Sequence, residues 1–224
     1  MLYYKDMKFR ALEEAEVIKR EKRFRLYIKH NGEEKLSYLP NPGRLQEIIY
    51  PSAKVYITPT EDPKRKTRFE AVLGMQDSHF VSLNASLANK IFEESLPFFP
   101  VKVKEFSREV YFHGKRYDFL INSRILIEVK SVTLVKDRVG LFPDAPTERG
   151  AQHLEYMTDW LFEKWVVFVV QRDDVDIVMP NEEMDPRFYN SAKKLYENKG
   201  AFFAFKCNVN LNGIYFKDFV NVKI

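Results

Sequence analysis

The stretch RYDFLINSRILIEVKSVTL, residues 116–134, decides the fold of this chain. It predicts two β-strands joined by a short turn at residues 122 and 123. Side chains two residues apart in a strand point to the same face, so Glu128 and Lys130 project together from the second strand. If the strands pair as a hairpin, Asp118 of the first strand can lie near Glu128. Two carboxylates and an amine on apolar strands indicate a site, because a buried charge is costly unless it is paired or binds a metal.

These three groups suit metal-assisted cleavage of a phosphodiester. The carboxylates of Asp118 and Glu128 are hard oxygen ligands for Mg²⁺ or Mn²⁺, and a bound ion lowers the pKa of its water. Lys130 can stabilise charge on the attacking water or on the phosphate. The spacing Asp-x₉-Glu-x-Lys on paired strands resembles the PD-(D/E)XK nuclease signature. A buried salt bridge between Lys130 and one acid is the competing interpretation of the same residues.

Short strands separated by turn signals occupy the N-terminal part of the chain. We expect strands within residues 8–30 and at 36–39, 54–58, 67–73 and 79–83, with a helical turn at 45–49. Asn31 and Gly32 form the strongest hairpin signal. The pattern predicts an OB-like β-barrel over residues 1–85, a fold that commonly binds nucleic acid.

Residues 86–224 predict a second domain. We expect a helix at 84–94, a strand at 107–112 before the two central strands, an irregular loop at 141–150, a helix at 151–164 and a buried strand at 165–170. Asp185 and Pro186 begin another helix that ends at Gly200, and strands at 201–206 and 214–220 follow. The order αβββαβ is that of the nuclease core, so the fold class is α+β with a mixed sheet, and motif and element order agree.

The positive charge is concentrated in the first domain. The net charge is +4, and residues 1–85 hold 16 Lys and Arg against 12 Asp and Glu, whereas residues 86–224 hold 20 of each. This asymmetry predicts a surface for a polyanion, with a solvated surface as the simpler alternative. The residues assigned to nucleic-acid contact are Arg44, Lys64, Arg65, Lys66 and Arg68.

Six stretches together resemble the sugar fermentation stimulation protein family. They are PNPGR (40–44), KRK (64–66), SLNASLANK (82–90), RYDFLI (116–121), IEVKSVTL (127–134) and FPDAPTERGAQHL (142–154). Pro42 stands where the family often has Thr, and Tyr117 is a second mild departure. The resemblance implies DNA binding by an OB-like domain followed by a PD-(D/E)XK-like domain, and it leaves catalysis open.

Further polar residues surround the motif. Glu109, on the preceding strand, is a third possible metal ligand, with a surface glutamate as the alternative. Asp144 and Glu148 lie in the loop beyond the central strands and could ligate the metal or support its ligands. Arg149 and His153 are four residues apart and so share a helical face. Arg149 could hold a phosphate, and His153 could orient it or a ligand, with a structural histidine as the alternative.

We therefore predict a DNA-binding protein with a Mg²⁺-dependent nuclease site and largely sequence-independent binding of duplex or single-stranded DNA. The alternatives are a non-catalytic DNA-binding regulator of sugar (maltose) metabolism genes and a carbohydrate-linked enzyme. The one cysteine, Cys207, excludes an internal disulfide and fits a reducing compartment. No signal peptide is apparent, and the apolar run at 165–170 is too short to span a bilayer. A cytoplasmic protein without a membrane partner is expected, in an oligomeric state that the sequence leaves open.

Overall fold

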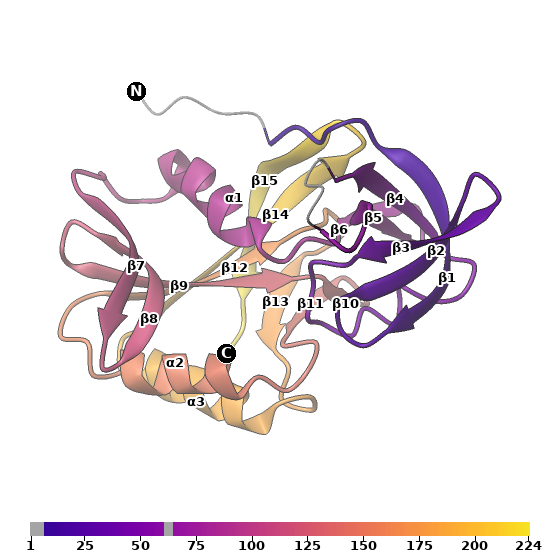
Figure 1. The fold of residues 1–224 in the computed structure, drawn as a ribbon. Coiled ribbons are helices and arrows are strands. Elements are labelled where there is room, and N and C mark those ends of the chain that lie inside the picture. The colour runs from indigo at the N-terminus through magenta and orange to yellow at the C-terminus, as the bar shows by residue number, and fades with distance from the viewer. Residues whose placement is uncertain (1–6, 61–64) are drawn as a thin grey trace.

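The computed structural model describes residues 7–60 and 65–224. The first part of the chain forms a closed barrel of five strands, because β3 pairs with β5 in parallel at Ser37 and Phe69 and so joins the two ends of the sheet. A sixth strand extends from β5 (Figure 1). The predicted OB-like barrel is confirmed. Its strands are β1 (Glu13–Glu21), β2 (Arg25–His30), β3 (Glu33–Tyr38), β4 (Lys54–Pro59), β5 (Phe69–Gln76) and β6 (His79–Ser82).

Alternation of apolar and charged residues builds this barrel. Leu26 and Ile28 of β2 are fully buried, while the residues between and beside them face outward. The turn after β2 has φ values of 51° at Asn31 and 79° at Gly32, as the predicted hairpin requires. The expected helical turn at 45–49 is present as a single turn, in which the N–H groups of Ile48 and Ile49 donate to the carbonyl oxygen of Leu45 at 3.1 and 2.7 Å. It does not extend into a helix, and Leu45 at its start has a φ of 52°.

The rest of the chain forms one mixed sheet of nine strands, in the order β10-β11-β13-β15-β14-β12-β9-β8-β7. Helix α1 packs on one face, and α2 and α3 pack on the other (Figure 1). The strands are β7 (Phe106–Phe112), β8 (Lys115–Ile121), β9 (Ile125–Val132), β10 (Leu134–Lys136), β11 (Val139–Phe142), β12 (Lys164–Val170), β13 (Ile177–Pro180), β14 (Ala201–Asn210) and β15 (Gly213–Val222), and the helices are α1 (Leu87–Ser95), the 3₁₀ turn Leu96–Phe98, α2 (Glu148–Met157) and α3 (Pro186–Glu197).

The order of α1, β7, β8, β9, α2 and β12 confirms the predicted core. Strand β12 is buried along its whole length because it lies between β9 and β14, with which it pairs in parallel. Asp185 caps α3 by accepting a hydrogen bond from the backbone N–H of Phe188 at 2.9 Å, as expected. Three short strands, β10, β11 and β13, were not expected, and the first two residues of the predicted loop at 141–150 belong to β11.

Helix α2 also differs from its predicted bounds. It begins at Glu148, where Thr147 accepts a hydrogen bond from the N–H of Gly150 at 3.1 Å, and it ends at Met157 instead of continuing to residue 164. The apolar spacing suggested a longer helix because Leu161 continues it. That side chain is 90% exposed, so no burial supports a further turn.

Buried polar contacts join the barrel to the sheet. The N–H of Ser82 donates to the carbonyl oxygen of Gln171 at 3.1 Å, and Arg172 Nη1 donates to Gln76 Oε1 at 2.8 Å and to the Thr133 carbonyl at 3.0 Å. Arg172 is 1% exposed and forms a bidentate pair with Asp174. The division of the chain near residue 85 stays a prediction. None of the helices in residues 7–60 and 65–224 has the length and apolar character needed to span a bilayer.

Candidate active site

Strands β8 and β9 bring the three motif residues together. The backbone pairing between these strands ends at Phe119 and Ile127. Beyond that pair, the side chain of Asp118, and not its backbone, contacts β9. Asp118 Oδ2 accepts a hydrogen bond from the backbone N–H of Val129 at 2.8 Å. Asp118 therefore lies beside Glu128, as the predicted hairpin required.

Glu128 is the centre of the site and is only 4% exposed. Its Oε1 accepts hydrogen bonds from Lys130 Nζ at 2.6 Å and from His153 Nδ1 at 2.7 Å. Burial opposes ionisation most strongly, but Lys130 and His153 together outweigh it and hold the pKa of Glu128 below its usual value. The second oxygen, Oε2, is buried without a hydrogen-bond partner among the described residues. A buried carboxylate oxygen in that state is a free coordination position.

Asp118 is partly buried and supplies the second carboxylate. Besides the bond from Val129, its Oδ1 accepts from Asn89 Nδ2 of α1 at 2.7 Å. Burial, followed by the negative charge of Glu128, raises the pKa of Asp118. An acid whose ionisation is disfavoured by a neighbouring carboxylate, together with an unpartnered oxygen on that neighbour, fits a divalent cation bound through oxygen.

Asn89 is a member of this site that the residue-by-residue analysis missed. It lies in the stretch SLNASLANK at 82–90, which carried part of the family resemblance. Because it comes from α1, on the opposite face of the sheet from α2, only the packed structure shows that it reaches Asp118.

His153 and Arg149 of α2 support Glu128. Arg149 Nε donates to His153 Nε2 at 3.3 Å, so His153 carries its proton on Nδ1 and donates it to Glu128. The hydroxyl of Tyr117 donates to the backbone carbonyl of His153 at 2.8 Å, which fixes the helix against β8. The two residues share a helical face as expected, and they form a chain of hydrogen bonds that ends on the Glu128 carboxylate.

The structure does not bring Glu109 into this site. Its side chain is 67% exposed and pairs with Arg116 Nη1 at 3.3 Å. Glu109 has a φ of 56°, so the backbone of β7 is locally left-handed there. Periodicity along the strand could not show this.

Asp144 and Glu148 also have other partners. Asp144 Oδ2 accepts from the N–H of Leu45 at 3.1 Å, and a Cβ on Gly43 would lie 2.5 Å from the same oxygen. Asp144 therefore fastens the loop after β11 to the barrel. Glu148 is exposed and accepts from Gln152 Nε2 at 3.1 Å. Neither acid touches Asp118 or Glu128 in the hydrogen bonds of the described residues.

We expect Asp144→Ala to lower the free energy of unfolding by about 1–3 kcal/mol, because it leaves the buried N–H of Leu45 without an acceptor. Affinity for Mg²⁺ should stay within twofold of the wild type. Urea unfolding and calorimetric titration with Mg²⁺ measure the two quantities. Asp144→Asn, which keeps an acceptor oxygen, is the matched control. A large loss of Mg²⁺ affinity in Asp144→Ala would restore this residue as a ligand.

A cleft of about 330 Å³ leads to Lys130 from the barrel side. Arg23 and the residues 41–43 line it on the barrel, and Lys130, Ser131 and the residues 141–147 line it on the sheet. Figure 1 shows β9 running toward this junction. Lys130 thus contacts the Glu128 carboxylate and also lines a space open to a substrate.

The predicted nucleic-acid contacts lie around the same end of the barrel or outside the described residues. Arg44, Lys66 and Arg68 are exposed, and Arg65 pairs with Glu70 at 2.9 Å. Lys64 lies outside the described residues.

A second group could hold a metal ion. Ligand atoms of His79, Asp173 and Asp174 lie within 4.8 Å of one another. Asp173 already accepts from Lys217 at 3.3 Å and contacts His79 at 2.8 Å, while Asp174 is paired with Arg172. All four carboxylate oxygens of Asp173 and Asp174 thus have partners, whereas Glu128 keeps one buried oxygen without a partner among the described residues. Glu128 is therefore the better candidate for a metal ligand.

Comparisons with known proteins agree with this fold. A model of the "Sugar fermentation stimulation protein RE domain" matches residues 82–213, and one of the "SfsA N-terminal OB domain" matches residues 18–83. A sugar fermentation stimulation protein homolog from Natranaerobius thermophilus is 38% identical over 218 residues, covering 91% of each chain. A homolog from Clostridium kluyveri is 33% identical, covering 94% of this chain and 96% of its own.

A solved structure shares the whole fold. SfsA of Pyrococcus furiosus, described in complex with Ca²⁺, matches with a TM-score of 0.88 and 23% identity over 97% of this chain and 98% of its own. At this identity the match establishes the architecture, a barrel followed by a mixed sheet.

Proposed function

Since this chain belongs to the sugar fermentation stimulation protein family, we propose that it binds DNA and hydrolyses phosphodiester bonds with the help of Mg²⁺ or Mn²⁺. One observation carries the proposal. Glu128 is buried, one of its oxygens is held by Lys130 and His153, and the other has no partner among the described residues.

The residues fit a divalent ion. Asp118 and Glu128 would hold it, and the ion would supply an activated water and neutralise charge on the phosphate. The relative from Pyrococcus furiosus is described as a Ca²⁺ complex, and Ca²⁺ and Mg²⁺ both choose hard oxygen ligands.

The chain's own groups divide the remaining work. Lys130 lies at the wall of the cleft and can stabilise negative charge that develops on the phosphate. His153, held by Arg149, fixes the rotamer of Glu128. Arg23 on the opposite wall can contact the DNA backbone. Contacts with phosphates carry no sequence information, so binding is expected to be sequence-independent and weakened by salt.

A DNA-binding regulator of sugar metabolism genes that does not cut is the second candidate. It is favoured by the pairing of Glu128 with Lys130, because that carboxylate then has a counter-charge without any metal. In this case DNA binding would not need a divalent ion.

Cleavage of linear duplex, circular duplex and single-stranded DNA with Mg²⁺, Mn²⁺ or EDTA separates the two candidates. We expect metal-dependent cutting by the wild type that is lost in Asp118→Ala and Lys130→Ala, while binding measured on the same samples is kept in Asp118→Ala. Glu109→Ala is the control, since this exposed acid should be dispensable. Tight binding of DNA without cleavage of any substrate would exclude the nuclease and favour the DNA-binding regulator.

A further inference from the structure

Two more hollows lie beside the cleft, between the barrel and the segment that joins the barrel to α1. The first, of about 410 Å³, shares Pro42 and Ala85 with the cleft at Lys130. The second, of about 440 Å³, shares Arg65, Glu70 and Asn84 with the first. Because neighbouring hollows share their walls, they form one groove from the β1–β2 turn to the segment before β1. We call it the junction groove.

The junction groove is positively charged. Among the described residues, five cations and two acids, Asp144 and Glu70, line its three hollows. Arg65 pairs with Glu70 and Lys130 with Glu128, so the excess of positive charge comes from the other three cations. The cations are Lys8, Arg10, Arg23, Arg65 and Lys130.

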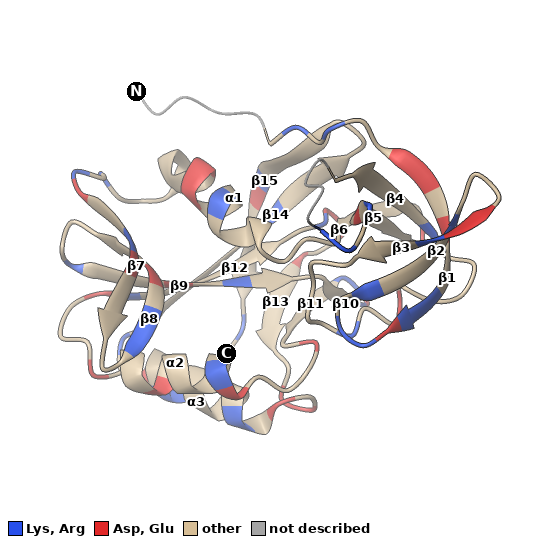
Figure 2. Cartoon of the chain, viewed as in Figure 1, with Lys and Arg blue, Asp and Glu red and all other residues tan. Residues whose placement is uncertain are grey.

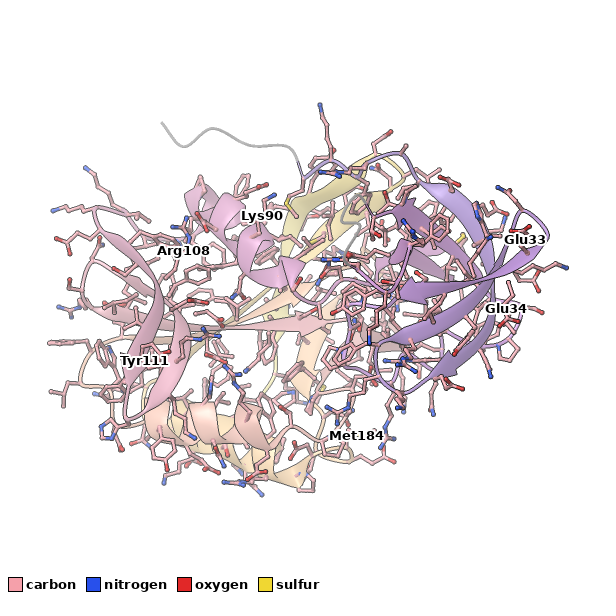
Figure 3. The ribbon with its side chains drawn as sticks, in the orientation of Figure 1. Glu33, Glu34, Lys90, Arg108, Tyr111 and Met184 are labelled. Carbon is pink, nitrogen blue, oxygen red and sulfur yellow. The ribbon has the colours of Figure 1, made fainter. Side chains whose placement is uncertain are left out.

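The barrel itself is charged unevenly, in the same sense. Figure 2 shows Lys and Arg gathered at the turn between β1 and β2, which adjoins the groove. At the other end of these strands, β1 and β3 each begin with two glutamates. Figure 3 shows Glu33 and Glu34 at this outer end, away from the sheet. A polyanion is therefore attracted to the groove end of the barrel.

An aromatic pair lies in the middle of the groove. Phe24, on the β1–β2 turn, is 42% exposed, and its ring centroid lies 6.0 Å from that of Tyr38. The guanidinium of Arg65 lies 5.9 Å from the centre of the Tyr38 ring. Both rings line the middle hollow. An exposed ring between cations is how proteins bind unpaired bases, because every base can stack and the backbone follows the charges.

We propose that the junction groove binds a single-stranded segment of DNA, with a base stacked at Phe24 and Tyr38 and the backbone leading to Lys130. This rests on the proposed function and specifies its substrate: DNA with a single-stranded end or gap. A duplex presents its bases already stacked, so it cannot use a ring recessed in a groove.

Phe24→Ala tests this inference through binding in EDTA, so that no cleavage occurs. The probes are a fluorescent 15-nucleotide oligo(dT) and a blunt duplex of the same length. We expect the dissociation constant for oligo(dT) to rise about tenfold, while the constant for the duplex changes by less than twofold. Tyr111→Ala is the matched control, because Tyr111 is 72% exposed on β7 at the far edge of the sheet (Figure 3).

Phe24→Trp is the control for loss of structure at this position. A larger aromatic ring there should keep wild-type affinity for oligo(dT). An unchanged oligo(dT) affinity in Phe24→Ala, or an equal loss for oligo(dT) and duplex, would overturn the inference. Binding of an oligo(U) RNA that is tenfold tighter than binding of oligo(dT) would also overturn the inference.

Cleavage of duplexes with and without a single-stranded overhang, measured in Mg²⁺, separates the groove proposal from the nuclease proposal. If neither duplex is cut while Phe24→Ala still weakens the binding of oligo(dT), the proposed nuclease activity is wrong and the proposed binding of single-stranded DNA in the groove is supported.

Discussion

Glu128→Gln is expected to reduce metal-dependent cleavage of DNA by about 10³-fold, because loss of a metal ligand forfeits several kcal/mol of transition-state stabilisation. Glutamine has nearly the same shape and can still accept a hydrogen bond from Lys130 or His153. It lacks the negative charge that both the ion and the amine of Lys130 require. The measurement is the single-turnover rate at saturating protein, with Mg²⁺ affinity followed by calorimetry on the same preparations.

Glu148→Gln is the matched control, since it makes the same chemical change on an exposed acid of α2 whose contact is Gln152. It should cleave at the wild-type rate. The loss of charge leaves Lys130 without its carboxylate partner, so Glu128→Gln should also lose about 1–3 kcal/mol of stability. A folded Glu128→Gln protein that cuts at the wild-type rate would remove Glu128 from the mechanism.

Arg172→Met is expected to lower the free energy of unfolding by about 3–5 kcal/mol, which is the cost of breaking a buried ion pair from one side. The guanidinium is fully enclosed and joins Asp174 to Gln76 of the barrel and to the Thr133 carbonyl of the sheet. Methionine fills similar space but leaves these acceptors unpaired. Urea unfolding at pH 7 measures the loss, and Arg138→Met, which breaks an exposed pair with Asp176, should cost less than about 1 kcal/mol.

The loss of unfolding free energy caused by Arg172→Met should become smaller as the pH falls. Burial opposes ionisation of Asp174, but Arg172 outweighs it and lowers the pKa of Asp174 below its usual 3.8. The pair therefore contributes its full stability above that usual value, and the contribution is lost as the pH falls through the lower pKa of the folded protein. The gap between wild type and Arg172→Met should narrow below pH about 4. A gap that stays constant down to pH 2 would show that the ion pair is not its source.

Local patterns predicted most of the αβββαβ core. The continuous apolar run at 165–170 became β12, and Asp185 with Pro186 began α3 where expected. These signals are reliable because capping and side-chain alternation depend on neighbours within a few residues. Strands β10, β11 and β13 were missed for the converse reason. Each has three or four residues, and β11 is paired on one side by β13, which follows it 35 residues later in the sequence.

The sequence by itself determined the barrel, the αβββαβ order and the convergence of Asp118, Glu128 and Lys130, since these depend on residues close together in the chain. Only the tertiary structure decided which polar residues join them. His153 reaches Glu128 across 25 positions and Asp144 is drawn to Leu45 across 99, while Glu109 faces solvent. The junction groove likewise exists only because the barrel, the segment before α1 and the loop after β11 pack beside one another. Such contacts depend on where the whole chain runs, and no local periodicity encodes that path.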